Sequence, residues 1–249
     1  MARSARGIGF AALVLSAIAL LAAQRGAAAE PSPADIIELA IKATGGAEAI
    51  AKQKAMTWGE SGTYYGQGAA QPYTARYASE LPNKFKMEIV DVFTIVFDGK
   101  QGWIKSMGTV TEMTDDQLAE QKENTYTSRL TTLLPLKEKE ITLSAAGEGN
   151  VNGKPTIAIK VSSKDHRDVT LSFDKETFLL AKVESTVKSS ELGKEVKQEI
   201  VLSGYDEVEK VKMPKKYVIT RDGEKYVESE MTDVAIVDKH DEGTFGKPE

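Results

Sequence analysis

Short segments in which apolar and polar residues alternate, separated by turn residues, recur from Met56 almost to the end of this 249-residue chain. Alternation with a period of two is typical of strands that bury one face and leave the other in water. Because the turns between them are short, neighbouring strands should run antiparallel. We therefore expect a mainly β (α+β) fold built on an antiparallel meander. The expected strands cover residues 84–89, 92–97, 103–104, 157–161, 169–173, 179–189, 196–202, 217–219 and 226–237.

Two helices are expected before the first strand. Ser32, Pro33 and Asp35 have the identities of an N-cap, a first helical residue and a third-position acid. This helix should end at the glycine pair that begins with Gly45. A second, shorter helix is expected over residues 47–54.

A third helix is expected in the middle of the chain. Thr114 and Gln117 form a capping-box pattern, and the helix should run to about Leu134 and stop at Pro135. Few apolar residues occur in its first half, whereas its second half is rich in leucine. The first turns should therefore be weakly anchored and able to move.

The strand over residues 92–97 differs from the others because both of its faces are apolar. Phe93, Ile95 and Phe97 point to one side, and Val92 and Val96 point to the other. A strand of this composition is covered on both sides.

The N-terminus is typical of an exported protein. Arg3 and Arg6 precede an uninterrupted apolar run, residues 8–23, and a stretch of small residues follows. This layout predicts a secretory signal peptide spanning residues 1–29 and a single mature domain spanning residues 30–249. A membrane anchor is the alternative, but the run is shorter than the ~20 residues that a spanning helix needs. No later segment is apolar and long enough to cross a bilayer.

Charge and cysteine content limit the possible partners of the protein and the ways in which its fold can be stabilised. Three of the 32 Lys and Arg residues belong to the signal peptide, so 29 remain against 37 Asp and Glu, a formal net charge of −8. Such an acidic domain argues against nucleic acid as a partner. The chain has no cysteine, so a hydrophobic core must hold the fold, and about 220 residues can bury one.

The sequence offers no arrangement typical of catalysis. His166 and His240 lie among charged residues, and without converging ligands we interpret them as a polar hairpin tip and a frayed C-terminal stretch rather than a metal site. Asp115 and Asp116 suit the first turn of a helix. The chain has no thiol and no Gly-x-Ser-x-Gly motif, and its Gly-Gln-Gly at 66–68 lacks the helix of a phosphate loop. We expect no catalytic residue, no metal and no cofactor.

Aromatic and other large apolar residues are concentrated between Met56 and Met113. Each of them alone is best explained as core. Together, beside a weakly anchored helix, they also fit an apolar cavity with a lid. They are Trp58, Tyr64, Tyr73, Tyr77, Phe85, Met87, Phe93, Phe97, Trp103 and Met107.

Two of these segments resemble the core signature of the LolA-type outer-membrane lipoprotein carrier superfamily. Residues 81–87 read Leu-Pro-Asn-Lys-Phe-Lys-Met, and residues 95–103 read Ile-Val-Phe-Asp-Gly-Lys-Gln-Gly-Trp. In that family a Pro-Asn-x-Phe strand leads into one ending Asp-Gly-Lys-x-x-Trp. The order of elements agrees as well. The Ala-Thr-Gly-Gly at 43–46 and the highly charged later strands differ, which indicates a divergent paralogue.

The resemblance implies a curved antiparallel sheet that forms an incomplete β-barrel, closed by helices, around an apolar cavity for acyl chains. Residues 114–134 would be the lid. Typical carriers have an arginine before the Pro-Asn that bonds to the lid; Leu81 stands here, which leaves open whether the lid is free or held by another contact. The ligand-binding residues so implied are Phe85, Met87, Phe93, Ile95, Phe97, Trp103, Leu130, Leu133 and Leu134.

These expectations favour a periplasmic, non-catalytic carrier that binds the acyl chains of lipids or lipoproteins, as in transport or outer-membrane lipoprotein sorting. A membrane-bound protein that loads the carrier or receives its cargo would be a further partner. The alternative is an envelope sensor or scaffold that binds another protein through the same half-barrel. A continuous apolar cavity would favour the carrier, and an interior filled by side chains would favour the scaffold.

Overall fold

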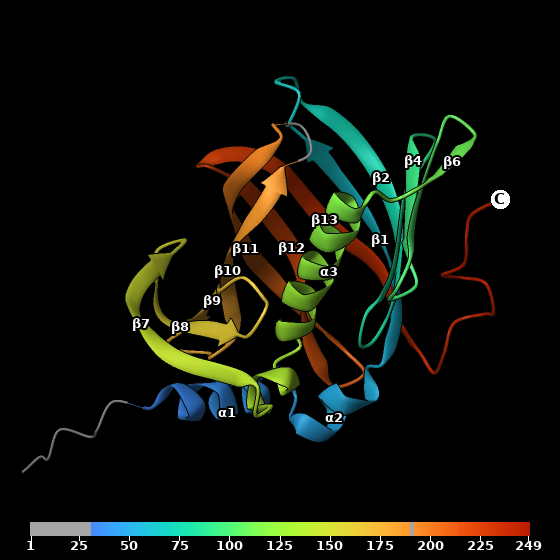
Figure 1. Ribbon diagram of the computed structural model, residues 1–249. Coiled ribbons are helices and arrows are strands. Elements are labelled where there is room, and N and C mark those ends of the chain that lie inside the picture. The colour runs from blue at the N-terminus through green and yellow to red at the C-terminus, as the bar shows by residue number, and fades with distance from the viewer. Residues whose placement is uncertain (1–30, 190–191) are drawn as a thin grey trace, which may run out of the picture. The chain divides into compact units, whose positions relative to one another are not determined.

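The computed structural model describes residues 31–189 and 192–249 (Figure 1). The predicted signal peptide lies outside these residues. Within them, thirteen antiparallel strands form one sheet, in the order β6-β5-β4-β3-β2-β1-β13-β12-β11-β10-β9-β8-β7. The strands are β1 (Ala55–Tyr64), β2 (Gln71–Glu80), β3 (Lys84–Ile89), β4 (Phe93–Phe97), β5 (Gly102–Ser106), β6 (Thr109–Glu112), β7 (Ile141–Val151), β8 (Lys154–Ser163), β9 (Val169–Asp174), β10 (Leu180–Ser189), β11 (Lys194–Val208), β12 (Val211–Arg221) and β13 (Glu224–Val237).

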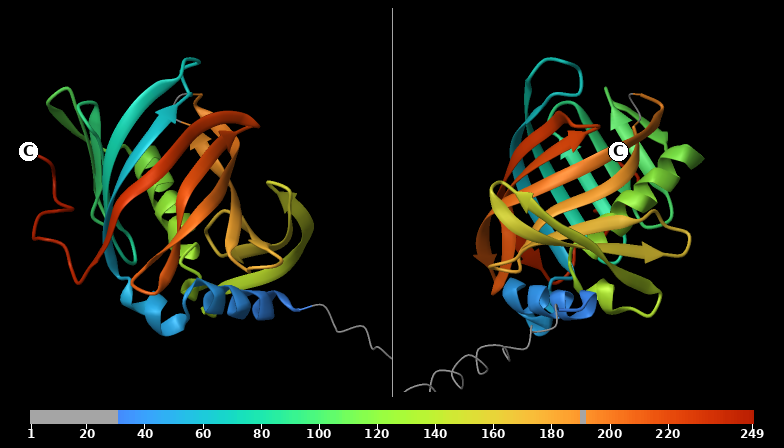
Figure 2. Two further views of the ribbon diagram at one scale, coloured as in Figure 1. Left: turned by 180° about the vertical axis from the view of Figure 1, so that it is seen from behind. Right: turned by 90° about the vertical axis from the view of Figure 1, so that its left-hand side faces the viewer.

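The order of the strands shows two meanders joined at one seam. Strands β1–β6 follow one another through short turns, and so do β7–β13; pairing of β1 with β13 joins the two sets. Strands β6 and β7 are the two edges, so the sheet is not closed into a barrel. Figure 2 shows the strong curvature of the sheet, with α3 on its concave side. The predicted open, curved antiparallel sheet with helices is confirmed.

Helices α1 (Pro33–Thr44) and α2 (Ala47–Lys52) lie beneath one end of the sheet in Figure 1. The predicted cap is confirmed, because the hydroxyl of Ser32 accepts a hydrogen bond from the Asp35 amide at 3.2 Å and the Asp35 carboxylate accepts one from the Ser32 amide at 3.0 Å. Gly45 ends α1 at a φ of 136°, and a Cβ there would lie 2.1 Å from the carbonyl oxygen of Lys210. Only glycine allows the end of α1 to approach the turn between β11 and β12 so closely.

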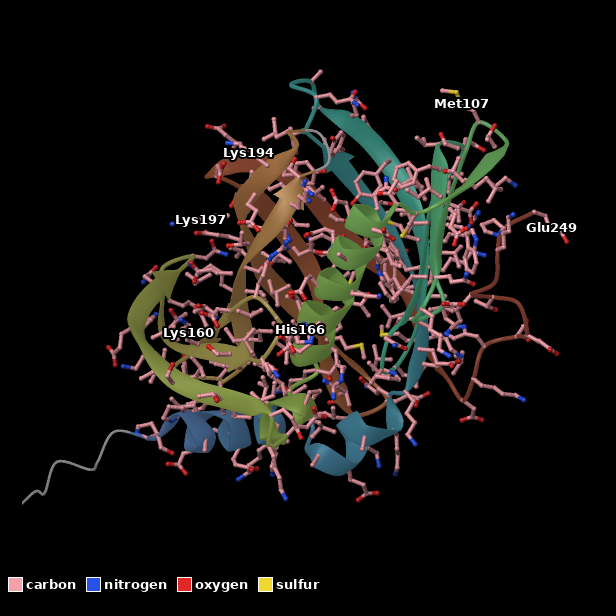
Figure 3. All side chains as sticks on the ribbon, in the orientation of Figure 1. Met107, Lys160, His166, Lys194, Lys197 and Glu249 are labelled. Carbon is pink, nitrogen blue, oxygen red and sulfur yellow. The ribbon has the colours of Figure 1, made fainter. Side chains whose placement is uncertain are left out.

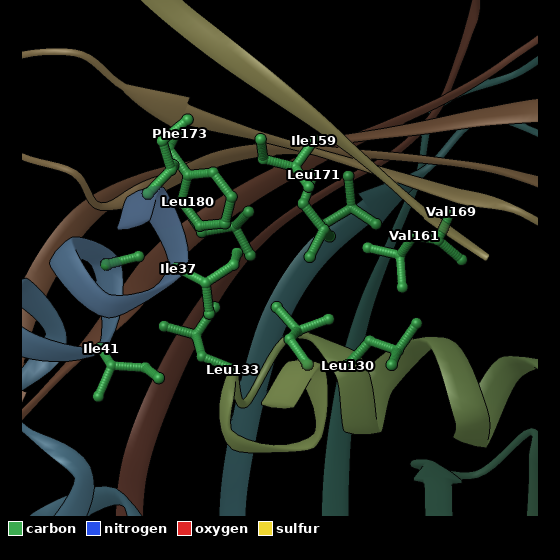
Figure 4. Close-up of a cluster of buried hydrophobic side chains, with 14 of the residues drawn as sticks. Ile37, Ile41, Leu130, Leu133, Ile159, Val161, Val169, Leu171, Phe173 and Leu180 are labelled. Atoms are coloured by element: carbon green, nitrogen blue, oxygen red, sulfur yellow. The ribbon is translucent and has the colours of Figure 1, made fainter. Parts of the chain in front are cut away.

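The largest hydrophobic cluster fills the concave side of the second meander. Helix α1 and the segment after α3 supply one wall, and strands β8–β10 supply the other (Figure 4). All of its members are nearly inaccessible to water, which makes this cluster the main stabilising core. Its most buried large side chains are Ile36, Ile37, Leu130, Leu133, Ile159, Val161, Val169, Leu171, Phe173 and Val183.

Helix α3 (Asp115–Leu130) begins where the Thr114 capping box predicts but ends four residues before Leu134. The hydroxyls of Thr131 and Thr132 donate hydrogen bonds to the carbonyls of Ser128 and Arg129 at 2.7 and 2.8 Å, satisfying groups that a longer helix would have used. Leu133 then adopts a φ of 70°, and a short 3-10 helix, η1 (Leu134–Lys137), contains Pro135. The expected helix end was therefore wrong.

The two edge strands, β6 and β7, were not expected from the sequence, and the expected strands also did not include β1 and β2. Strand β7 contains Ala-Ala-Gly-Glu-Gly at 145–149, and strand β6 has only four residues. Both lie at sheet edges, where one side has no partner and little apolar surface is needed, so alternation is weak. Most of the β7 side chains are exposed.

Residues 238–249 are packed rather than frayed, so that interpretation of the C-terminus was wrong. Phe245 is buried on the convex side of β2, β4 and β5, against Ala78, Val96 and Trp103. The ring of His240 lies edge-on to Phe245 at a centroid distance of 5.0 Å, and its Nε2 lies 2.9 Å from the Ser79 carbonyl oxygen. The tail thus supplies the second cover that the doubly apolar strand β4 requires.

Ile37 and Leu39 on helix α1 provide a test of the core. Replacement of Ile37, which is 1% exposed, by alanine should lower the free energy of unfolding by roughly 2 to 5 kcal/mol, because a cavity is left in the main cluster. The matched change Leu39→Ala, at a side chain 38% exposed, should cost less than about 0.5 kcal/mol. Urea unfolding followed by circular dichroism measures both; equal losses would contradict the assigned packing of α1.

Candidate functional site

The concave side of strands β1–β5 carries a group of apolar side chains that we call the aromatic face. Directly paired residues of antiparallel strands share one side of the sheet, so the register defines its members. One row runs across five strands through Trp58, Tyr77, Met87, Ile95 and Ile104. The aromatic face comprises Trp58, Tyr73, Tyr77, Phe85, Met87, Ile89, Phe93, Ile95, Phe97 and Ile104.

Most of the aromatic face is only half-buried, unlike the main cluster. Phe85, Met87, Phe93 and Ile95 all keep contact with solvent, whereas Phe97 is 1% exposed. Apolar groups of this kind, gathered on one concave surface, typically mark a binding site. The structure brings together these five residues that the family resemblance implied.

The other four residues implied by the resemblance lie elsewhere. Leu130 and Leu133 are 0% and 2% exposed within the main cluster of the second meander, and Leu134 packs against the same cluster. Trp103 points to the convex side, because it pairs with Val96 and packs beneath Phe245. The structure therefore does not bring Trp103 together with the aromatic face.

A bulge in strand β13 lies opposite the first aromatic residue. The β1–β13 pairing shifts between Thr57 and Gly59, so that Trp58 of β1 faces two residues of β13, Asp233 and Val234. Its indole stacks on Tyr77 at a centroid distance of 4.8 Å and an interplanar angle of 2°, and Tyr77 contacts Phe85 at 6.1 Å. Stacked rings of this kind are rigid and stabilise each other.

A buried carboxylate lies at the border between the aromatic face and the second meander. Glu60 is 3% exposed, and its Oε1 accepts a hydrogen bond of 3.0 Å from the Trp58 indole. Its Oε2 accepts a short bond of 2.5 Å from Tyr217 and longer ones of 3.4 Å from Tyr73 and 3.3 Å from Ser229. In residues 31–189 and 192–249, no Lys, Arg or His forms an ion pair with this carboxylate. Four neutral donors therefore replace its hydration.

Gly62 leaves room for Tyr73 to reach the Glu60 carboxylate. It pairs with Tyr73 on one side and Ser229 on the other, in a row that continues to Tyr217 and Leu202. A Cβ at this position would lie 2.8 Å from the ring of Tyr73 and 2.6 Å from a backbone carbonyl of β13. The missing side chain lets the Tyr73 ring lie across β1 and reach Glu60.

The tyrosines around Glu60 are neutral. Burial is the main reason that the pKa of Tyr77 and that of Tyr217 are raised far above the ordinary value, and the negative charge of Glu60 raises both further. Burial also raises the pKa of Tyr73. All three hydroxyls therefore keep their protons at physiological pH.

Sequence reasoning missed Glu60, although a signal for it exists. Trp58, Glu60, Gly62 and Tyr64 occupy alternate positions of one strand, so the carboxylate falls on the side that otherwise carries aromatic residues. A charged residue in an inward position of a strand is unusual and indicates a special environment.

Helix α3 lies across the concave side and is tied by charged groups to the second meander. Arg167, between β8 and β9, donates from Nη1 to Glu120 at 2.7 Å and to the Thr186 carbonyl at 3.3 Å. Its amide donates to Glu123 at 3.0 Å, and Lys188 of β10 pairs with the first-turn Asp116 at 2.7 Å. We call these contacts the α3 clasp.

His166, which Figure 3 shows beside α3, extends the clasp with a ring contact. Its imidazole stacks on Tyr126 at a centroid distance of 3.6 Å, and its Nδ1 lies 2.8 Å from Glu123 Oε1. Leu81 is 40% exposed. The helix is thus held by residues of β10 and of the loop between β8 and β9, and not by the residue before Pro82.

Two hollows of about 350 and 420 Å³ lie outside the aromatic face. The first lies between the C-terminal tail and Glu80, and the second lies beside Pro214 at the β11–β12 turn. Within the described part of the chain, no group of three or more His, Cys, Asp or Glu side chains could hold a metal ion. No helix among residues 31–189 and 192–249 is long and apolar enough to cross a membrane.

Comparisons with solved structures identify the fold. A LolA superfamily protein from Nitrosomonas europaea superposes with a TM-score of 0.58 at 10% identity, over 87% of this chain and 98% of the other. A domain described as an outer membrane lipoprotein-sorting protein, from Vibrio parahaemolyticus, gives 0.54 at 12% identity over 84% and 95%. A DUF1329 family protein from Desulfovibrio piger gives 0.57 at 12% identity over 86% and 97%.

These likenesses show the class of fold: the chain is a LolA-like half-barrel, as the resemblance at residues 81–103 implied. No family model matches the sequence, and no curated protein matches it. With identities of 10–12%, it is a divergent example of that fold.

The α3 clasp can be tested by hydrogen exchange. Arg167→Gln removes the bonds to Glu120, whose carboxylate is only 14% exposed, so amides of the first half of α3 should exchange about tenfold faster. Arg76→Gln removes an exposed pair with Glu88 on the sheet and should leave α3 unchanged. Mass spectrometry of peptides covering α3 and α1 gives the comparison; equal protection of α3 in all three proteins would contradict the clasp.

Proposed function

We propose that this protein is an exported, periplasmic carrier that holds the acyl chains of a lipid or lipoprotein against the aromatic face and moves or presents them without forming covalent bonds. The observation that carries the proposal is the half-buried state of Phe85, Met87, Phe93 and Ile95 on one concave surface. Side chains of a finished core would be closed off from water, as they are in the main cluster.

The energetics suit reversible binding. Each methylene removed from water contributes about 0.8 kcal/mol, so a chain of ten or more carbons gains enough to offset the loss of freedom on association. The aromatic face is broad enough to offer contacts along a row of five strands. Release then needs only partial exposure of the chain rather than the opening of a sealed core.

Helix α3 fits the part of a movable cover. Among the described residues its apolar anchors lie at its C-terminal end, where Leu130 enters the main cluster, whereas its first turns are held by the α3 clasp. Breaking an ion pair such as that of Arg167 and Glu120 costs only about 1 kcal/mol, far less than removing buried Leu130 from the main cluster. The first turns could therefore move while the C-terminal end stays in place.

The scaffold alternative has one observation in its favour. The concave side of the second meander is filled by Leu130, Leu133 and helix α1, so this half of the interior offers no room for a ligand. A scaffold would need no room at all, whereas the carrier needs the aromatic face to be accessible. Ligand binding therefore separates the two functions.

Two substitutions on strand β4 test the carrier. Ile95→Asp places a charge on the aromatic face and should weaken binding of an acyl ligand at least tenfold, because the charge must lose water when the chain binds. Thr94→Asp introduces the same residue on the opposite side of the same strand and should leave binding unchanged.

The measurement is native mass spectrometry with lipid extraction on protein expressed from the full sequence, followed by titration with a fluorescent fatty acid. Circular dichroism checks that both variants fold. Co-purifying acyl lipid, or uptake of the fatty acid, that is lost in Ile95→Asp alone supports the carrier. A ligand-free mass with no uptake of fatty acid or lipopeptide would leave the scaffold as the better proposal.

A further inference from the structure

Glu60 places a negative charge directly behind the rings of the aromatic face. The carboxylate itself is 3% exposed, whereas Trp58, Tyr73 and Tyr217, which donate to it, are only half-buried. A ligand on the concave side would therefore touch the rings and not the carboxylate. The charge can act on the ligand only through and between these rings.

The rings transmit the charge rather than cancel it. Neutral donors stabilise a buried carboxylate but leave its net charge in place, and no ion pair within the described residues neutralises Glu60. The faces of indole and phenol rings already attract cations, and a hydrogen bond from the ring to an anion adds to that attraction. Low polarity around the site makes the effect stronger than it would be in water.

A purely structural role would not require a charge. Glutamine could accept the same hydrogen bond from the indole. Burying an apolar residue in a sheet ordinarily costs less free energy than burying a carboxylate. In the register of the sheet, Glu60 pairs with Ala75, and the same row continues to Ile89 and Phe93 of the aromatic face, where an acyl or alkyl chain would lie. The rings around Glu60 and the apolar row beside them are complementary to the two parts of an amphiphile, a positive head and an apolar chain.

We propose that the aromatic face selects amphiphiles with a positively charged ammonium head group, which rests on the rings around Glu60 while the chain lies along strands β3–β5. This inference rests on the proposed carrier function and adds the charge of the ligand to it. Anionic amphiphiles, including free fatty acids, should bind less tightly than cationic ones of the same chain length. The expected preference is about tenfold, the size of a partly desolvated cation–π contact.

The experiment compares three probes that share a twelve-carbon chain: dodecyltrimethylammonium, dodecyl maltoside and dodecanoate. Binding to the full mature protein is followed by calorimetry below the micelle concentration of each probe. The wild type should bind the cationic probe about tenfold more tightly than the neutral one, and the anionic probe least tightly. Glu60→Gln, which keeps the size of the side chain, should bind all three within about twofold.

Two further variants control for general charge and for folding. The protein is acidic overall, so Glu88→Gln, which removes one carboxylate from the opposite side of the sheet, should keep the full preference. Trp58→Leu keeps the charge and the apolar surface but removes one ring, so the preference should fall severalfold while maltoside binding persists. This variant decides the matter if Glu60→Gln does not fold.

Each outcome bears on a different conclusion. A preference that is present in the wild type, lost in Glu60→Gln or Trp58→Leu and kept in Glu88→Gln supports the inference. Equal binding of the three probes, or a preference that survives both site variants or falls equally in Glu88→Gln, overturns it and leaves the carrier function standing. Failure of every probe, the neutral one included, overturns the carrier function and this inference with it.

Discussion

The pairing of β1 with β13 is the interaction on which the rest of the structure depends. It joins two separate meanders, the first from β1 to β6 and the second from β7 to β13, into one curved sheet. Residues far apart in sequence become neighbours there, and Glu60 receives donors from both meanders, including Tyr73 from the first and Tyr217 from the second. Without this seam neither the concave side nor the buried carboxylate would exist.

The two meanders use their concave sides differently. Helix α1 and the leucines after α3 fill the second meander with a closed apolar core, which supplies most of the apolar burial. The first meander is covered on its convex side by Phe245 of the C-terminal tail, so its concave aromatic residues are not needed to close a core. Stability and ligand contact can therefore be provided by different parts of one sheet.

Much of the fold could be predicted because local rules govern it. The capping boxes at Ser32 and Thr114 mark helix starts, and alternation marks most interior strands, although β1 and β2 were not among the expected ones. The strand β7 and the end of α3 could not be predicted, because an edge strand needs little apolar surface and the helix end depends on hydroxyl bonds and on where Leu133 is buried. The candidate site was predicted in part, since Phe85 and its neighbours share one face whereas Trp103 lies on the other.

The sequence by itself determined the class of fold, the N-caps of α1 and α3, and the presence of a dense aromatic segment. Each of these depends on residues within about ten positions of one another. Only the tertiary structure decided which aromatic residues face one another, that the α3 clasp rather than an arginine before Pro82 holds the helix, and that Glu60 is buried. Those features depend on contacts between segments far apart in sequence, and the burial of Glu60 depends in addition on the pairing of β1 with β13. Register is set by packing over the whole sheet and not by any single segment.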